Sequence, residues 1–166
     1  MNIYLIGLPG SGKTTLGKIL AKEINYDFID LDEIIEQNAL MFVNEIFSFY
    51  GEKNFRIFET DALRSLDVEN TVISLGGGIV LNRENKKYLN GLVIFINSSL
   101  DIIEERLKTN PRPILKTNTL MDLYLDRIKK YHDFAHIIVN DYNDIDLTIK
   151  ELILKIKEYK NEDFSN

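Results

Sequence analysis

The sequence predicts an α/β fold of three layers, an αβα sandwich in which helices cover both faces of a central five-stranded parallel sheet. Short apolar runs alternate with longer amphipathic stretches, which is typical of buried parallel strands connected by helices. The first apolar run leads directly into a glycine-rich turn and then into an amphipathic stretch. A length of 166 residues with 45% hydrophobic content suits one core. We therefore expect a single domain over residues 1–166.

The expected elements follow these runs in chain order. In the first half, apolar runs predict strands at 2–6, 26–30 and 71–75, and the stretches between them predict helices at 13–23, 31–37, 43–50 and 52–66. In the second half, strands are expected at 92–96 and 137–139, with helices at 83–89, 100–109, 120–131 and 145–159. Residues 110–118 are polar and interrupted by prolines, so we expect a mobile loop or lid at about 109–119. The polar residues 161–166 are expected to fray.

The composition argues against several classes of function. A formal net charge of −6 disfavours binding to nucleic acid through a broad basic surface. The chain has no cysteine, which excludes disulfides, thiol nucleophiles and cysteine-ligated metals. The opening apolar run has no basic leader and is too short for a signal peptide, and no stretch approaches the roughly 20 apolar residues of a membrane span. We expect a cytoplasmic protein with neither nucleic acid nor membrane as a partner.

Residues 7–14 read Gly-Leu-Pro-Gly-Ser-Gly-Lys-Thr and fit the phosphate-loop pattern G-x-x-x-x-G-K-[ST] between a predicted strand and a predicted helix. Glycines let the backbone approach phosphate oxygens, and the helix N-terminus adds its dipole. Lys13 supplies a cation that can follow charge leaving the γ-phosphate, and the Thr14 hydroxyl can ligate Mg²⁺. The alternative, a glycine-rich turn capped by Thr14, leaves the lysine unexplained. ATP is expected to contact Gly10, Ser11, Gly12, Lys13, Thr14 and Thr15.

Two acids, Asp30 and Asp32, end the second predicted strand, at the edge of a parallel sheet where ligands bind. Two carboxylates beside a triphosphate would repel it unless a metal ion or a hydroxyl donor intervened. One interpretation has Asp30 holding Mg²⁺ through water, while Asp32 accepts the hydrogen bond of an attacking hydroxyl. The alternative is a helix cap followed by an exposed acid in the first turn.

Four arginines are candidates for binding anions. Arg56 shares a helix face with Glu59, which favours either an arginine oriented to grip a carboxylate or a weak surface ion pair. Arg127 could complete a clamp with Arg56, although its spacing alone favours an ordinary basic turn of a helix. Arg112, between two prolines, could close over ATP from the lid as an arginine finger does, or belong to a flexible surface loop. Arg106 could lie against the adenine plane.

Three glycines follow the third predicted strand, where many phosphate-loop proteins place an acidic Walker B residue. A run of glycines favours backbone that approaches a ligand closely. The only two histidines, His132 and His136, have the i, i+4 spacing of a zinc pair. However, no third ligand is evident and His136 is expected to begin a strand, so we do not expect zinc binding.

Across residues 1–160, the phosphate loop, D-x-D, F-R-x-x-E, the triple glycine, R-P-x-L and R-x-x-x-Y occur in the order that resembles the shikimate kinase family. The resemblance implies the fold of P-loop NTPases and nucleoside monophosphate kinases. It also implies a monomer that transfers the γ-phosphoryl of MgATP to the 3-hydroxyl of shikimate. Matching positions imply that Lys13, Asp32 and Arg112 are catalytic and that Thr14, supported by Asp30, binds Mg²⁺. Shikimate would be held by Asp32, Arg56, Gly76, Gly77, Gly78 and Arg127, and the phosphates of ATP would also contact Arg112.

The sequence departs from the family pattern at two places. The segment between Arg106 and Arg112 is shorter than is usual. The final strand is followed by residues 139–142, Val-Asn-Asp-Tyr, where family members often place another nucleotide-contacting arginine. A gluconate kinase or a nucleoside monophosphate kinase is the nearest alternative, because both can share the opening loop. A non-enzymatic nucleotide-binding module is disfavoured, since the chain has no N-K-x-D guanine-reading motif.

Overall fold

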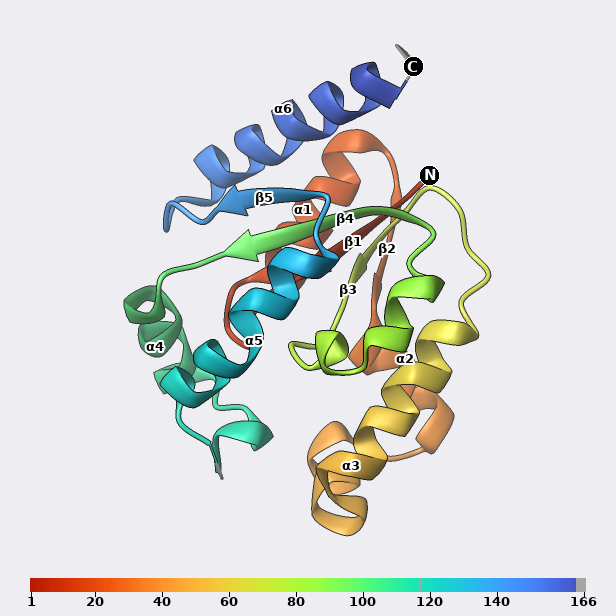
Figure 1. The fold of residues 1–166 in the computed structure, drawn as a ribbon, viewed down its shortest axis with the longest axis vertical. Helices are drawn as coiled ribbons and strands as arrows, with labels where there is room; N and C mark the ends of the chain where they lie inside the picture. Colours follow the sequence, from red (N-terminus) through yellow and green to blue (C-terminus); the bar gives the residue numbers. More distant parts are fainter. Residues whose placement is uncertain (117, 164–166) are drawn as a thin grey trace.

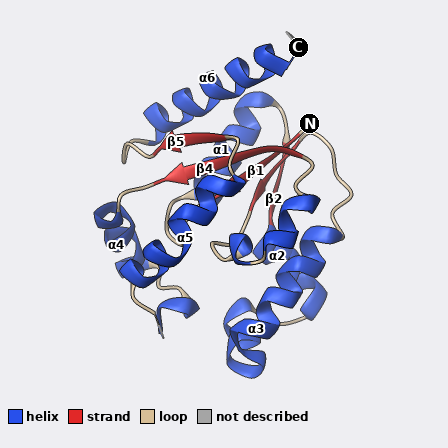
Figure 2. Ribbon diagram, viewed as in Figure 1, coloured by secondary structure: helices blue, strands red, loops and turns tan. Residues whose placement is uncertain are grey.

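The computed structural model describes residues 1–116 and 118–163. Five parallel strands form a sheet in the order β2-β3-β1-β4-β5, with helices above and below it (Figure 1, Figure 2). The predicted α/β fold is confirmed. The elements are β1 (Asn2–Ile6), α1 (Lys13–Ile24), β2 (Asp27–Asp30), α2 (Leu31–Ala39), α3 (Val43–Arg64), β3 (Thr71–Ser74), 3₁₀ helices at Ile79–Leu81 and Arg83–Tyr88, β4 (Gly91–Asn97), α4 (Leu100–Thr109), a 3₁₀ helix at Pro113–Lys116, α5 (Leu120–Phe134), β5 (Ile137–Asn140) and α6 (Ile145–Asp163).

Helices bury both faces of the sheet. In Figure 1, α1 and α6 lie on one side of the strands, whereas α2, α3 and α5 lie on the other. Neighbouring residues along a strand point to opposite faces, so Ile3 and Leu5 of β1 join the apolar cluster under α1 and α6, while Tyr4 and Ile6 join the cluster on the opposite face. Burial on both faces is why the central strands read as almost continuous apolar runs.

The strand order creates a crevice at the carboxyl ends of β1 and β3. These two strands are neighbours, yet the chain leaves β1 to form β2 on one side and leaves β3 to form β4 on the other. Ligands bind to open parallel sheets at such a point, where consecutive connections leave in opposite directions. The phosphate loop follows β1 and the triple glycine follows β3, so both lie beside this crevice.

Local sequence signals start the helices next to the crevice. Gly12, with φ of 83°, adopts the left-handed conformation directly before α1. Asp30 caps α2, because its Oδ1 accepts from the N–H of Asp32 at 3.1 Å. Thr119 caps α5 and forms a capping box with Asp122. The reading of Asp30 as a helix cap is therefore confirmed, without excluding a second role for its other oxygen.

Several predicted boundaries need correction. The helices predicted at 43–50 and 52–66 are both present and are separated at Gly51, whose φ of 77° and ψ of 171° are not helical. The two are labelled together as α3, and the second ends at Arg64 rather than at residue 66. The helix predicted at 83–89 is a 3₁₀ helix at Arg83–Tyr88, and the predicted lid contains a short 3₁₀ helix at Pro113–Lys116. His136 precedes β5 and does not begin it, although its N–H already donates to the Val93 carbonyl at 2.9 Å.

The C-terminal helix extends further than the sequence predicts. α6 continues to Asp163, which covers the first half of the segment expected to fray. Residues 164–166 of that segment, and residue 117 of the predicted lid, lie outside the described residues. Within the described part of the chain, no helix combines the length and apolar character needed to cross a membrane.

Candidate active site

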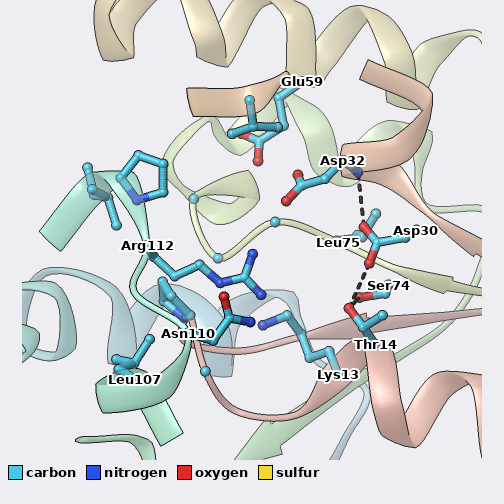
Figure 3. Close-up of a pocket in the computed structure, with 18 of the residues that line it drawn as sticks. Lys13, Thr14, Asp30, Asp32, Glu59, Ser74, Leu75, Leu107, Asn110 and Arg112 are labelled. Atoms are coloured by element: carbon cyan, nitrogen blue, oxygen red, sulfur yellow. Dashed lines mark hydrogen bonds between the residues drawn. The ribbon is translucent and has the colours of Figure 1, made fainter. Parts of the chain in front are cut away.

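A cavity of about 500 Å³ opens at the carboxyl ends of the strands, where the phosphate loop, α3, α5 and the lid meet (Figure 3). All but one of the residues predicted for the site line it. The exception is Ser11, which is fully buried. The predicted residues that line the cavity are Gly10, Gly12, Lys13, Thr14, Thr15, Asp30, Asp32, Arg56, Gly76, Gly77, Gly78, Arg112 and Arg127.

Ser11 shapes the phosphate loop from behind. Its N–H donates to the Leu8 carbonyl at 3.1 Å and therefore closes a turn in this structure. Its Oγ accepts from Lys13 Nζ at 3.2 Å. The same ammonium also donates to the carbonyls of Gly7 (3.0 Å) and Leu8 (2.9 Å), so the lysine lies folded along the loop.

Lys13 is held in an environment that disfavours its charge. Burial lowers the pKa of Lys13 to about 7, and the positive charge of Arg112 acts in the same direction, against the opposing influence of Asp32 and Asp30. Figure 3 shows Lys13 and Arg112 extending into the middle of the cavity from different sides. Two positive charges that lie close together repel each other, and an anion bound between them stabilises the charged form of both side chains. This pair is suited to a polyphosphate.

Next to the loop lies a cluster of hard oxygen atoms. Thr14 Oγ1 donates to Asp30 Oδ2 at 2.6 Å and lies 3.3 Å from Ser74 Oγ (Figure 3). Hydroxyl and carboxylate oxygens are donors that Mg²⁺ prefers. Residues 1–116 and 118–163 contain no group of three or more acidic or histidine side chains arranged to hold a metal. The donor set therefore fits an ion that takes its remaining ligands from phosphate and water, as Mg²⁺ commonly does.

Asp32 faces the cavity between Asp30 and Glu59 (Figure 3). Burial, together with the neighbouring carboxylates of Asp30 and Glu59, raises the pKa of Asp32 to about 6, against the opposing influence of Arg112 and Lys13. A carboxylate with a pKa near the working pH is well suited to accept a proton. The reading of Asp32 as an exposed first-turn acid is therefore wrong.

Arg56 and Glu59 form a buried pair. Arg56 Nη1 donates to Glu59 Oε2 at 2.9 Å, Nη2 donates to Glu52 Oε1 at 3.0 Å, and the Glu59 side chain is 1% exposed. A surface ion pair is thereby excluded. Any Cβ on Gly78 would collide with the Arg56 guanidinium, and one on Gly76 would collide with the Glu59 carboxylate. The glycines are required because charged groups pack directly on the backbone.

Arg127 brings a second guanidinium to the same end of the cavity from α5. The residue is 2% exposed, so the reading as an ordinary basic turn is wrong. Its Nε and the Oε1 of Glu59 are buried and have no hydrogen-bond partner among the described residues. Buried polar atoms are rarely left unpaired, and here they adjoin a cavity that a ligand can enter. Four residues later, Tyr131 donates its hydroxyl to the Gly77 carbonyl at 2.5 Å and anchors the glycine loop.

The comparison that decides the family is a shikimate kinase family model, which matches residues 9–158. The chain belongs to the shikimate kinase family. The shikimate kinase of Bacillus cereus strain AH187 is 36% identical over 167 residues, which cover 97% of this chain and 99% of the relative. The structure of shikimate kinase from Acinetobacter baumannii in complex with shikimate has a TM-score of 0.87 at 30% identity, covering 95% of this chain and 93% of that one.

A gluconokinase structure shares the fold at a much lower sequence identity. The structure of a gluconokinase from Sinorhizobium meliloti 1021 has a TM-score of 0.65 at 14% identity, covering 99% of this chain and 97% of that one. This likeness concerns the fold alone. Membership of the shikimate kinase family makes the protein an ATP-dependent kinase, and its phosphate loop and cation pair are the local features suited to that chemistry.

In this shikimate kinase family member, charge in the cavity contrasts with charge on the whole chain. The chain carries a formal net charge of −6, yet basic side chains outnumber acidic ones in the lining. The cavity therefore attracts anions locally. The basic residues are Lys13, Arg56, Arg106, Arg112 and Arg127, against Asp30, Asp32 and Glu59.

Sequence reasoning did not predict the apolar walls of the site. Phe47 and Phe55 of α3, whose rings lie 4.4 Å apart, face the cavity together with residues of the lid region. Both residues belong to an amphipathic pattern that is equally typical of core residues, so no local sequence signal distinguishes residues that line the cavity from residues of the core. The unpredicted apolar lining residues are Pro9, Val43, Phe47, Phe55, Leu75, Leu107, Pro113 and Ile114.

The two histidines, His132 and His136, do not line this cavity. The ring of His132 packs edge-on against Phe95 at 5.5 Å. His136 Nδ1 accepts from the N–H of Val93 at 3.0 Å, which extends the pairing of β4 and β5. Both residues therefore serve packing and strand alignment.

Proposed function

We propose that the chain transfers the γ-phosphoryl group of MgATP to the 3-hydroxyl of shikimate, giving shikimate 3-phosphate and ADP. One observation carries the proposal: a single cavity joins a phosphate loop to two arginines, the buried Arg127 and the partly buried Arg56, with Asp32 between the two ends. A nucleotide and a small hydroxylated carboxylate suit these two ends. The family relationship, and the shikimate named in the structure of the Acinetobacter baumannii relative, support the choice of acceptor.

Shikimate would bind at the arginine end of the cavity. The guanidinium groups of Arg56 and Arg127 suit its carboxylate, because planar forks donate two parallel hydrogen bonds. Glu59 would fix Arg56 in place through the 2.9 Å bond. The backbone of Gly76, Gly77 and Gly78 would lie against the ring, and Asp32 would accept the hydrogen bond of the reacting hydroxyl.

The nucleotide would bind at the opposite end. Its phosphates would contact the backbone of Gly10, Gly12, Lys13, Thr14 and Thr15, while Ser11 shapes the loop, and Arg112 would close over them from the lid. Thr14 and Asp30 are the proposed metal-binding residues, supported by the oxygen cluster around the 2.6 Å bond between them. A bound Mg²⁺ would supply positive charge that shields the phosphates.

In the proposed mechanism, the side chains position the reactants and stabilise charge. Asp32 orients the 3-hydroxyl and takes its proton late, since a loose transition state demands little of a base. Lys13 and Arg112 stabilise the charge that moves toward the β–γ bridging oxygen. The apolar walls and the lid exclude water, which would otherwise compete as acceptor.

The direct test is an ADP-release assay with MgATP in which shikimate, gluconate, AMP or no acceptor is supplied, followed by mass analysis of the acceptor. We expect turnover with shikimate alone and a mass gain of one phosphoryl group. ADP release with gluconate, with AMP or without an acceptor would retain the nucleotide site and overturn the assignment of the acceptor.

The arginine pair makes a separate prediction about substrate affinity. Arg56→Lys and Arg127→Lys should each raise the KM for shikimate about 10- to 100-fold, because a lysine keeps the charge but loses the second hydrogen bond to the carboxylate. The KM for ATP should change little. Steady-state kinetics with each substrate varied in turn measure the difference.

Arg64→Lys is the matched control for Arg56→Lys. Arg64 lies on the same helix and pairs with Asp61 at the same i, i+3 spacing and the same 2.9 Å distance, but its side chain is 60% exposed. The control should leave the KM for shikimate unchanged. An unchanged KM in the Arg56 and Arg127 variants as well would remove these residues from the proposed carboxylate site.

We also propose that one copy of the chain, folded as a single domain over residues 1–166, is the functional unit. All residues proposed for catalysis and binding come from the one chain, which supports a monomer. A cytoplasmic location and the lack of a nucleic-acid partner stay predictions from composition.

A further inference from the structure

The segment after the last strand carries an acid that accepts hydrogen bonds from three groups. Asp141 directly follows β5, and its side chain is 4% exposed. Its Oδ2 accepts from Arg106 Nη1 at 2.6 Å and from Ser98 Oγ at 2.7 Å, and its Oδ1 accepts from the N–H of Asn143 at 2.9 Å. Both carboxylate oxygens are therefore satisfied without any contact to the nucleotide site itself.

Arg106 connects this carboxylate to the phosphate loop. Arg106 Nη1 also lies 3.5 Å from the Gly10 carbonyl oxygen. A Cβ added at Gly12 would lie 3.3 Å from the same nitrogen. The guanidinium also lines the main cavity, with 33% of the side chain exposed. One side of the guanidinium group is thus held by Asp141, and it lies directly over two glycines of the loop.

The pair is charged under working conditions. Burial alone would raise the pKa of Asp141, but hydrogen bonds from Arg106, Ser98 and the Asn143 backbone hold it below its ordinary value. An unpaired arginine on a surface helix samples many rotamers and loses that freedom when it binds a ligand. Pairing with a buried carboxylate removes most of that cost before the ligand arrives.

We propose that Asp141 is a positioning residue for the nucleoside triphosphate, acting through Arg106. It holds the guanidinium over Gly10 and Gly12, so that the nucleotide end of the cavity is preformed. The inference rests on the proposed function only in taking a nucleotide as the ligand at this end. It does not depend on which acceptor is phosphorylated.

The direction of the effect separates positioning from simple electrostatics. Asp141 is a negative charge beside a site for polyphosphate, so neutralising it would strengthen nucleotide binding if through-space repulsion dominated. A positioning role predicts the opposite, because the freed Arg106 must be ordered again on binding. Asp141→Asn keeps the size of the side chain, removes its charge and replaces one of the two acceptor oxygens with an NH2 donor, so it weakens the set of hydrogen bonds that holds Arg106.

The test measures MgADP binding by isothermal titration calorimetry for the wild-type protein, Asp141→Asn, Arg106→Gln and the double variant, without shikimate. We expect Asp141→Asn to weaken binding about tenfold, the scale of one lost charge-assisted hydrogen bond. The KM for ATP should rise in parallel, with kcat within about twofold of wild type. In the Arg106→Gln background, the Asp141 substitution should have almost no further effect.

Glu105→Gln is the control, because Glu105 lies on the same helix as Arg106 and forms an exposed 2.6 Å ion pair with Lys108. It removes the same charge and should leave MgADP affinity unchanged. Equal or tighter binding by Asp141→Asn would overturn the inference, as would a tenfold loss that persists in the Arg106→Gln background. Failure of the wild-type protein to bind MgADP would instead overturn the nucleotide site and with it the proposed function.

Discussion

Lys13→Met is expected to lower kcat about a thousandfold, which is the scale of losing a group that stabilises charge in the transition state. In the structure, the lysine donates to the Gly7 and Leu8 carbonyls and lies beside Arg112. Methionine preserves the length of the side chain and removes only the ammonium. Single-turnover measurements at saturating MgATP and shikimate separate this effect from weaker binding.

Lys22→Met is the control for this substitution, because Lys22 lies on the same helix but is exposed. It should leave kcat unchanged. A Lys13→Met enzyme with kcat within about tenfold of wild type would show that the ammonium is not needed for phosphoryl transfer.

The depressed pKa of Lys13 also predicts proton uptake on nucleotide binding. Since burial lowers the pKa to about 7, the charged and the neutral lysine are both populated near pH 7 before a nucleotide binds. A bound polyphosphate favours the charged form and raises the pKa, so binding takes up protons and affinity falls as pH rises above 7. Calorimetry in buffers of different ionisation enthalpy measures the uptake, which should disappear in Lys13→Met.

Asp32→Asn is expected to lower kcat by about 10²- to 10⁴-fold, the range for removing a general base, while MgATP affinity stays nearly intact. The carboxylate lies in the cavity between Asp30 and Glu59, and asparagine can orient a hydroxyl there but cannot take its proton. Near-normal turnover would contradict the role of Asp32. Asp27→Asn, an exposed substitution on β2, the strand that precedes Asp32, should have no effect.

The pH profile of the wild-type enzyme tests the same assignment. Asp32 must be ionised to accept a proton, and its pKa is raised to about 6 by burial and by Asp30 and Glu59. We therefore expect kcat/KM for shikimate to fall about tenfold for each pH unit below about 6. The fall should be absent from the residual activity of Asp32→Asn. A profile that stays flat down to pH 5 in the wild-type enzyme would reassign the base.

Much of the fold follows from local sequence patterns. The strand β1 and the helix α4 occupy the predicted residues, and the other strands differ by one or two residues at their ends. Such elements depend on periodicity and on caps a few residues away, which are visible along the chain. The helix predicted at 83–89 is present at Arg83–Tyr88, but its 3₁₀ type was not predicted.

The phosphate loop could likewise be recognised from eight consecutive residues, because its function resides in contiguous backbone. The sequence also named Asp32, Arg56 and Arg127 as candidates for the site. Their spacing was equally compatible with structural roles: an exposed acid in a first helical turn, a surface ion pair and an ordinary basic turn of a helix. Burial removed those alternatives: the Glu59 partner of Arg56 is 1% exposed, and Arg127 is 2% exposed. Burial depends on what packs over a residue from distant parts of the chain.

The sequence by itself determined the fold class, the phosphate loop and the set of residues that could carry the chemistry. Only the tertiary structure decided that two arginines from α3 and α5 share one cavity, that glycines are required where charged groups pack on the backbone, and that Asp141 holds Arg106 across 35 residues. The physical reason is the distance along the chain over which each interaction acts. Helix periodicity, caps and loops arise within one or two turns of chain, whereas the pairing, burial and pKa of a side chain depend on groups that only folding brings together.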